Sequence, residues 1–431
     1  MKQKEPQNIG QEAQEVPSIL TKHRLFPGDR VLWIIVAMFF AISMVVVYSA
    51  SAKLGFSEGS TNKYLHKHII TICVSIGVLL IFYLINLKHM RFFTRFAYMA
   101  SFVMTLIPYF QPPINNAHRW LDLGFFMFQP SELLKIATIT LLAARLSARH
   151  HIIKQIHLLP STFDVRKWSS EHELKILRNE ILPIVSPIAL TCMVILPDAT
   201  SSAFHIYVVS LVLLFIAGVR LREIGKLFIV SAILGVFAIL IMSLFDVGRL
   251  ETIKSRIMAW AGIERVEASR SMSVLDKYND TERSRMAIHN GGFFGVGAGR
   301  SIMRARLTHP ESDYLFAIVL EEFGLIISFV IVLLYLWLFF RALRIFERCE
   351  WLYAGLLAVG LALLITSQGF LHIGVAIGML PETGQNLPFL TQGRTGMFCA
   401  SIAVGIILSI SRQVAQGTAV PPSQQDSNRY I

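Results

Sequence analysis

The stretch LIISFVIVLLYLWLFF, residues 325–340, contains no charged residue and is the middle of an apolar segment that we place at 313–340. A helix that crosses the bilayer core needs about 20 mostly apolar residues. Nine more segments of this kind occur along the chain, at 31–50, 68–87, 93–110, 131–147, 181–197, 200–218, 226–245, 352–379 and 395–411. We therefore predict an all-α polytopic membrane protein with about ten transmembrane helices.

The composition supports this fold class. Of the 431 residues, 54% are hydrophobic and 16% are charged, with a mean hydropathy of +0.56. A soluble domain is about 45–50% apolar and about 25% charged, so the composition argues against a cytosolic globular enzyme. The four cysteines are far apart and form no CxxC pair, which argues against a disulfide framework or a zinc site. No Walker, HExxH or GxSxG motif is present, so ATP-driven transport and serine or zinc hydrolysis lack their usual signatures.

The distribution of basic residues predicts the orientation. Lys and Arg gather in alternate loops, at 88–95, 145–178, 220–226 and 341–348. Such loops face the cytoplasm, so we expect both termini to be cytoplasmic. The chain divides into a disordered tail at 1–30 without a cleavable signal peptide, a membrane domain at 31–412, and a polar tail at 413–431.

The segment 246–312 is the long extracytoplasmic loop between the seventh and eighth helices, and it departs from the charge alternation. It holds eleven basic and eight acidic residues, and it contributes to the net charge of +12. An excess of basic residues can bind nucleic acid, mark the cytoplasmic loops of a membrane protein, or bind an anionic substrate. The glycine-rich run NGGFFGVGAG at 290–299 does not follow a strand in a βαβ unit. We therefore interpret it as close backbone packing rather than a dinucleotide site.

Ionisable residues within the spans are candidates for function. Glu132 and Lys135 share one helix face, as a structural ion pair or as part of a site. Asp198 lies at the outer junction of the fifth and sixth helices. Asp313 opens the eighth helix, where it is an N-cap carboxylate or a functional group at the outer face.

Five ordered motifs resemble the SEDS family (shape, elongation, division and sporulation), the family of FtsW, RodA and SpoVE. The motifs are RWLDLG (119–124) with FQPSELLK (128–135), PD (197–198), NGGFFGVGAG (290–299), PESDYLFA (310–317) with EEFG (321–324), and TGQNLPF (383–389). The chain departs from the family pattern at Glu311-Ser312, at Ala199-Thr200-Ser201 and at 393–396. The outer-loop TGQ-LP motif is more similar to the division branch than to the elongation branch.

The resemblance implies a peptidoglycan glycosyltransferase that polymerises lipid II outside the bacterial cytoplasmic (inner) membrane, at the division septum. Asp313 would be the catalytic general base, with Glu132 and Lys135 in the same central cavity. The negative charge of the leaving group needs cations, and the candidates are Lys135, Arg119, Arg256, Arg285 and Arg306. The predicted substrate-binding set also includes Gln129, Ser131 and Asp198. A divalent cation, Mg²⁺ or Mn²⁺, would share the charge of the pyrophosphate, although no pattern identifies its ligands.

The same resemblance implies protein partners and leaves other functions open. The expected partner is a class B penicillin-binding protein, an FtsI-like transpeptidase, together with other divisome proteins and membrane lipids. Nucleic acid is not expected. The alternatives are a lipid II flippase or transporter, for which buried charges such as Glu132, Lys135 and Asp198 are typical, an elongation polymerase of the RodA branch, or an inactive scaffold.

Overall fold

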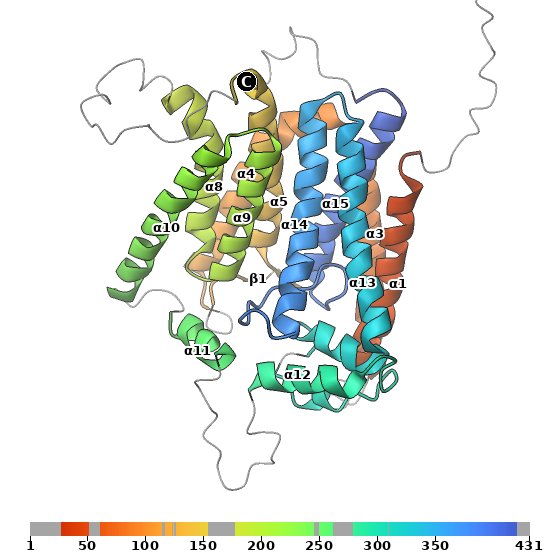
Figure 1. Cartoon of the computed structure of the whole chain (residues 1–431). Helices are drawn as coiled ribbons and strands as arrows, with labels where there is room; N and C mark the ends of the chain where they lie inside the picture. The colour runs from red at the N-terminus through yellow and green to blue at the C-terminus, as the bar shows by residue number, and fades with distance from the viewer. Residues whose placement is uncertain are drawn as a thin grey trace, which may run out of the picture.

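The computed structural model describes residues 27–50, 61–113, 117–122, 124, 126–153, 177–244, 250–261, 279–308 and 310–419. The predicted tails lie largely outside these residues, as do Arg265, Arg270 and Lys277 of the long loop. The described chain is mostly helical, and its helices form one bundle (Figure 1).

Each predicted span corresponds to one helix of the bundle. The helices are α1 (Arg30–Ala50), α3 (Thr61–Leu84), α4 (Leu87–Leu106), α5 (Pro130–Ala148), α8 (Leu182–Ile195), α9 (Thr200–Ile216), α10 (Leu221–Leu244), α13 (Leu315–Glu347), α14 (Leu352–Ala376) and α15 (Arg394–Ala415). Helices α3, α4 and α10 begin at residues 61, 87 and 221, earlier than the predicted 68, 93 and 226. Their first turns carry Lys63, Lys88 and Arg222, and charged turns extend a helix beyond the apolar stretch that hydropathy detects.

Five helices are long and apolar enough to cross a membrane by length and composition alone: α1, α3 (over Leu65–Leu84), α13, α14 and α15. The apolar helices α8 and α9 are shorter, at 14 and 17 residues. Helix α5 has 19 residues but carries Glu132, Lys135 and Arg145. Together these helices make the chain an all-α, multi-pass membrane protein, as predicted.

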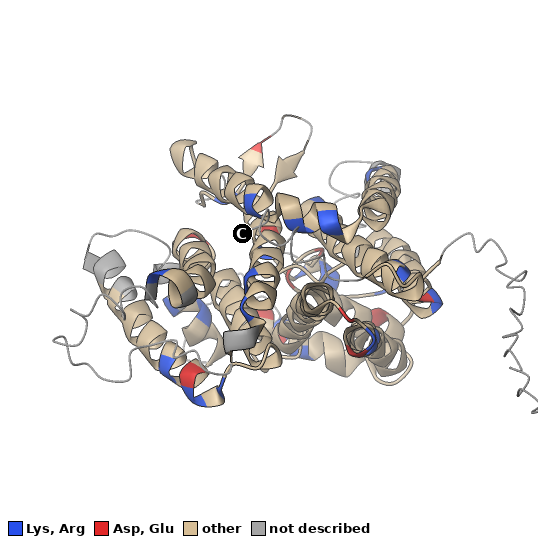
Figure 2. Cartoon of the chain, turned by 90° about the horizontal axis from the view of Figure 1, so that it is seen from above, with Lys and Arg blue, Asp and Glu red and all other residues tan. Residues whose placement is uncertain are grey.

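The first and last helices of the bundle meet at one end of the molecule. The backbone N–H of Asp29 donates to Ser411 Oγ at 2.7 Å, and Arg341 Nε donates to Asp29 Oδ2 at 2.7 Å. The start of α1 therefore lies beside the ends of α13 and α15, at the top of Figure 1. Viewed from this end, Lys and Arg occur on several of the helices (Figure 2). Both termini of the described chain share one side, as the charge pattern predicts.

Helix α14 forms the centre of the bundle. It contacts α5, α9, α13 and α15, and it is apolar and buried around almost its whole circumference. Small residues permit this close packing. A Cβ atom on Gly360 would lie 2.7 Å from the Ile139 side chain, and one on Gly369 would lie 3.2 Å from the Tyr335 ring.

The opposite end carries α11 (Leu250–Trp260), α12 (Asp280–Gly291) and the 3₁₀ turn η5 (Met303–Ala305) of the long loop. Asn279 and Glu282 form a capping box that starts α12. Shorter elements elsewhere are η1 (Ile107–Phe110), α6 (His150–Ile153), the π-helical turn η3 (Leu177–Ile181), and the antiparallel strands β1 (Leu121–Asp122) and β2 (Met127–Phe128).

The glycine-rich run packs against the backbone of α13. A Cβ atom on Gly291 would lie 2.0 Å from the carbonyl oxygen of Leu320, and one on Gly295 would lie 2.2 Å from that of Glu322. Gly324 has φ +73°, which interrupts α13 where the run crosses it. The predicted role of these glycines in close backbone packing is confirmed.

Candidate functional site

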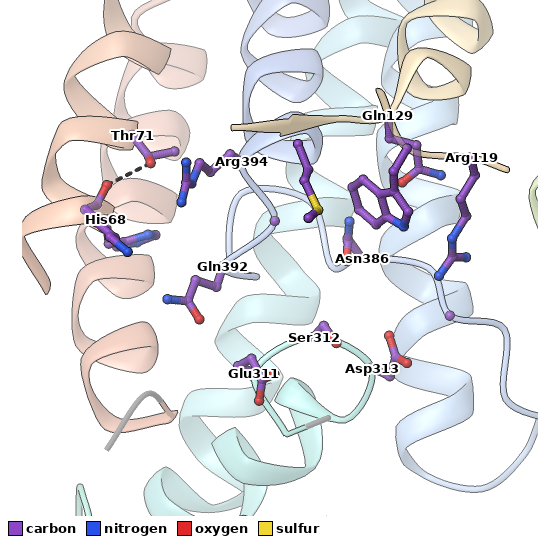
Figure 3. A pocket seen from close by; sticks show the side chains of 15 residues that line it. His68, Thr71, Arg119, Gln129, Glu311, Ser312, Asp313, Asn386, Gln392 and Arg394 are labelled. Atoms are coloured by element: carbon purple, nitrogen blue, oxygen red, sulfur yellow. Dashed lines mark hydrogen bonds between the residues drawn. The ribbon is translucent and has the colours of Figure 1, made fainter. Parts of the chain in front are cut away.

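A polar cavity of about 420 Å³ opens at the end of the bundle that carries α12. It is built from the start of α3, the loop before α5, the turn before α13 and the loop between α14 and α15. Its lining residues are Lys67, His68, Thr71, Arg119, Trp120, Met127, Gln129, Glu311, Ser312, Asp313, Gly384, Asn386, Gln392, Gly393 and Arg394 (Figure 3). Four segments that are far apart in the sequence thus meet at one site.

Asp313 lies in this cavity with its carboxylate available. Residues 311–314 form a turn, and α13 begins after Tyr314, which is its N-cap and makes no side-chain capping bond. The N-cap interpretation of Asp313 is therefore wrong. Among the residues that the structure describes, Asp313 makes no hydrogen bond and no ion pair. It is half-buried, and Figure 3 shows the side chains of Asp313 and Arg119 pointing toward one another on the same side of the cavity.

The other wall of the cavity is also basic. Arg394 opens α15 and Lys67 lies near the start of α3, and these two side chains supply the positive charge. His68 is fixed by a 3.0 Å hydrogen bond with Ser43 Oγ. Figure 3 shows His68 and Arg394 on the side away from Arg119 and Asp313. The cavity thus offers cations on two walls, which suits a ligand with more than one anionic or polar group.

Gln129 is held by its neighbours at the edge of the cavity. Its backbone N–H donates to Thr395 Oγ1 at 3.2 Å, and its side-chain amide donates to Ser131 Oγ at 3.2 Å. Thr395 Oγ1 also donates to the Met127 carbonyl at 3.3 Å, which joins β2 to α15. Ser131 is buried outside the cavity lining, so it positions Gln129.

Glu132 and Lys135 form a buried ion pair outside the cavity lining. Lys135 Nζ lies 2.8 Å from Glu132 Oε1, and the Lys135 side chain is 1% exposed. Lys135 also donates to Gln368 Oε1 at 3.2 Å, and Gln368 donates to the carbonyl of Asn386 at 3.1 Å. Since Asn386 lines the cavity, the ion pair reaches the site through two hydrogen bonds.

The remaining predicted binding residues do not line the cavity. Arg256 contacts Glu382 at 3.6 Å beside Gly384, and Arg285 donates to the Gly378 carbonyl at 3.0 Å. Arg306 follows η5. Asp198 lies between α8 and α9. The structure therefore brings together Arg119, Gln129 and Asp313 of the predicted set.

Sequence reasoning missed several lining residues, among them His68, Asn386, Gln392 and Arg394. Asn386 lies within the TGQNLPF motif and Arg394 follows it closely, so both carried a usable signal. His68 lies near the start of an apolar span and carried no such signal.

A second cavity of about 470 Å³ adjoins the first. The two cavities share the lining residues Trp120, Met127, Asn386, Gln392, Gly393 and Arg394.

The cavity contains two carboxyl side chains, Glu311 and Asp313, for a metal ion. Within the described ranges, no group of three or more His, Cys, Asp or Glu side chains is placed to hold a metal. Mg²⁺ is commonly bound by one or two carboxylates together with substrate phosphates. The residues of the cavity therefore fit a cation that arrives with a phosphate-bearing substrate, rather than a closed protein site.

A model of the FtsW/RodA/SpoVE family, described as "Cell cycle protein", matches residues 29–416. The chain belongs to this family. It is 28% identical to the "Probable peptidoglycan glycosyltransferase FtsW" of Coxiella burnetii over 389 residues, which cover 88% of this chain and 95% of that protein. It is also 28% identical to the "Stage V sporulation protein E" of Bacillus subtilis over 392 residues, 89% and 97% of the two chains.

Solved structures share the fold. The rod shape determining protein RodA of Thermus thermophilus aligns with a TM-score of 0.56 at 20% identity, over 90% of this chain and 97% of that one. A chain of a peptidoglycan synthase complex, studied for the structural coordination of polymerization and crosslinking, aligns with a TM-score of 0.56 at 20% identity, over 90% and 98%. The family predicted from the sequence motifs is therefore confirmed.

Proposed function

We propose that the protein is a peptidoglycan glycosyltransferase that polymerises lipid II at the outer face of the bacterial cytoplasmic membrane. The observation that carries this proposal is the position of Asp313. A half-buried carboxylate, free of capping and of ion pairing among the described residues, faces Arg119 in a polar cavity at the end of the bundle. Relatives over nearly the whole chain are named as glycosyltransferases of this kind.

In the proposed reaction, Asp313 is the general base. The acceptor sugar's 4-hydroxyl attacks the anomeric carbon of the donor, and the carboxylate of Asp313 takes the hydroxyl proton as the new bond forms. The bond from the anomeric carbon to the lipid pyrophosphate breaks in the same step, so we expect inversion at that carbon. Arg119 and Arg394, on opposite walls, are placed to stabilise negative charge on the donor and leaving group.

We further propose that a divalent cation, Mg²⁺ or Mn²⁺, accompanies the pyrophosphate, with Glu311 as its protein ligand. Glu311 and Asp313 both line the cavity, and a cation held by Glu311 alone would leave the Asp313 carboxylate to take the proton. When bound, the cation would neutralise charge on the leaving group. Chelation with EDTA should lower polymerisation, and readdition of Mn²⁺ should restore it; unchanged activity in EDTA would remove the cation from the reaction.

The proposed setting is septal synthesis with a class B penicillin-binding protein as the transpeptidase. Support comes from the relatives named FtsW and from the complex that couples polymerization and crosslinking in a structural neighbour. An elongation role of the RodA type is the competing setting. Depletion in cells discriminates them, because loss of septal synthesis gives filaments, whereas loss of elongation gives round cells.

The decisive experiment is polymerisation of purified lipid II by the full chain, with and without its transpeptidase. We expect Asp313→Ala to abolish glycan formation while it folds and inserts normally. Asp122→Asn, an exposed acid on β1 of the adjoining cavity, is the matched control and should stay active. A parallel assay of lipid II translocation in sealed vesicles tests the flippase alternative. Full glycan yield from Asp313→Ala would overturn the proposal.

A further inference from the structure

A third cavity, of about 400 Å³, lies at the opposite end of the bundle from Asp313. It is formed where the start of α1 meets the ends of α13 and α15, and its lining residues are Gly28, Asp29, Arg30, Val31, Arg341, Arg344, Ile345, Arg348, Ser411, Val414 and Ala415. Four arginines and one carboxylate face this space. Its volume falls within the range of about 300–1,000 Å³ that is typical of ligand sites.

The single carboxylate is fully occupied by the fold. Asp29 Oδ1 accepts the backbone N–H of Val31 at 2.9 Å, which caps α1, and its Oδ2 accepts Arg341 Nε at 2.7 Å. The backbone N–H of Asp29 donates to Ser411 Oγ. Gly28, with φ +114°, lets this segment approach α15, since a Cβ atom there would lie 3.2 Å from the Arg412 backbone nitrogen. The frame of the cavity is therefore built without the other arginines.

Three arginines of the cavity have no acidic partner among the residues that the structure describes. The side chains of Arg30, Arg344 and Arg348 make no hydrogen bond or ion pair with any residue that the structure describes, and all three are exposed. Arg344, in the last turn of α13, and Arg348, the C-cap residue of that helix, lie one turn apart, so they present one face. The nearby acids Glu347 and Glu350 are exposed and do not line the cavity. The positive charge of these three arginines therefore favours an anionic ligand.

The place of the cavity along α13 indicates the source of that anion. The arginines begin at residue 341, directly after the uncharged stretch 325–340. Charged residues at the end of an apolar span lie at the level of the lipid headgroups, and basic pockets between helices there bind anionic headgroups. The apolar lining residues Ile345 and Val414 suit the first carbons of an acyl chain.

We propose that this cavity is a binding site for a phosphate group, carried by the headgroup of an anionic phospholipid of the adjacent leaflet. The site is distinct from the cavity that contains Asp313, which lies at the other end of α13. Nothing in the proposed glycosyl transfer uses Arg344 or Arg348, so the proposal stands or falls independently of that function.

The test is native mass spectrometry of the full chain, purified in a mild detergent and titrated with phosphatidylglycerol or, for comparison, zwitterionic phosphatidylethanolamine. We expect the wild type to retain phosphatidylglycerol preferentially, and Arg344→Gln/Arg348→Gln to bind it roughly 10- to 30-fold more weakly. The matched control is Arg220→Gln/Arg222→Gln, which removes two exposed arginines from the start of α10 at the same end. This control should bind as the wild type does.

Four results would overturn the proposal. Equal retention of both lipids by the wild type, or equal binding by Arg344→Gln/Arg348→Gln and the wild type, would remove the site. An equal loss in the control would show that general charge, not the cavity, attracts lipid.

A second measurement asks whether the bound phosphate group belongs to a lipid or to a soluble compound. It is thermal unfolding in inorganic phosphate, compared with chloride at the same ionic strength. Stabilisation of the wild type alone at millimolar phosphate, without retained lipid, would reassign the site to a soluble phosphate compound.

Discussion

The ion pair of Glu132 and Lys135 is connected to the cavity with Asp313, although neither side chain lines that cavity. Both side chains are buried, and Lys135 divides its hydrogen bonds between Glu132 and Gln368. Gln368 in turn holds the backbone of Asn386 at the cavity. The pair therefore contributes to the shape of the loop between α14 and α15, in addition to balancing its own charges inside the bundle.

We predict that Lys135→Met destabilises the protein by about 3–5 kcal/mol, because it leaves the Glu132 carboxylate buried without its partner. The double variant Glu132→Gln/Lys135→Met should recover most of that loss, since both charges are then removed. Thermal unfolding in detergent measures the stability of each variant. A double variant as unstable as the single one would show that Lys135 acts through Gln368 rather than through the charge pair.

Polymerisation by the same variants separates structure from function. If the pair only stabilises the bundle, the double variant should synthesise glycan at a rate close to that of the wild type once it is folded. A stable double variant without activity would instead assign Lys135 a direct role in positioning the cavity loop.

At the scale of elements, the beginning of α13 organises the end of the bundle that carries Asp313. Glu321 accepts hydrogen bonds from Ser301 Oγ, from the backbone N–H groups of Ile302 and Met303 at 3.2 and 3.3 Å, and from Asn290 at 3.4 Å. Its neighbour Glu322 accepts from Ser49 and lies 3.6 Å from Arg304. Two buried carboxylates thus attach the loop at 290–304 and the end of α1 to the helix that follows Asp313.

We predict that Glu321→Gln loosens this loop, because an amide has one acceptor oxygen where the carboxylate has two, and hydrogen bonds to charged groups are worth about 1.5–3 kcal/mol each. Trypsin should then cleave after Arg300 and Arg304 several-fold faster than in the wild type. Glu347→Gln, an exposed acid near the other end of α13, is the control and should leave the cleavage rate unchanged. Unchanged cleavage in Glu321→Gln would mean that the glycine packing alone holds the loop.

The helices were predictable from sequence, whereas the loop contacts were not. Each span is a local apolar run, which hydropathy detects without knowledge of its neighbours. The partners of Glu321 lie 18–31 residues away in a segment with mixed charge, and only tertiary packing brings them together. The motifs identified Asp313, Arg119 and Gln129. Whether Asp313 caps α13 could be decided only from the backbone, which shows that Tyr314 is the N-cap residue. His68 was missed because its helix reads as an ordinary membrane span.

For the whole molecule, the two cavities at opposite ends make the orientation in the membrane the central question. The cavity with Asp313 faces outward only if the end with both described termini is cytoplasmic. Arg149, Arg220 and Arg348 lie at or next to helix ends on that side, as expected of cytoplasmic loops. Asp122 lies on β1 at the other end, beside the adjoining cavity.

We predict that a membrane-impermeant maleimide labels Asp122→Cys but not Glu350→Cys in intact spheroplasts, and labels both after lysis. The background is a variant in which Cys73, Cys192, Cys349 and Cys399 are replaced, because Cys73 is exposed and the next two are partly exposed. That background without a new cysteine is the control and should remain unlabelled. Labelling of Glu350→Cys before lysis would invert the bundle. It would place Asp313 in the cytoplasm, where a base for extracytoplasmic glycan synthesis could not act.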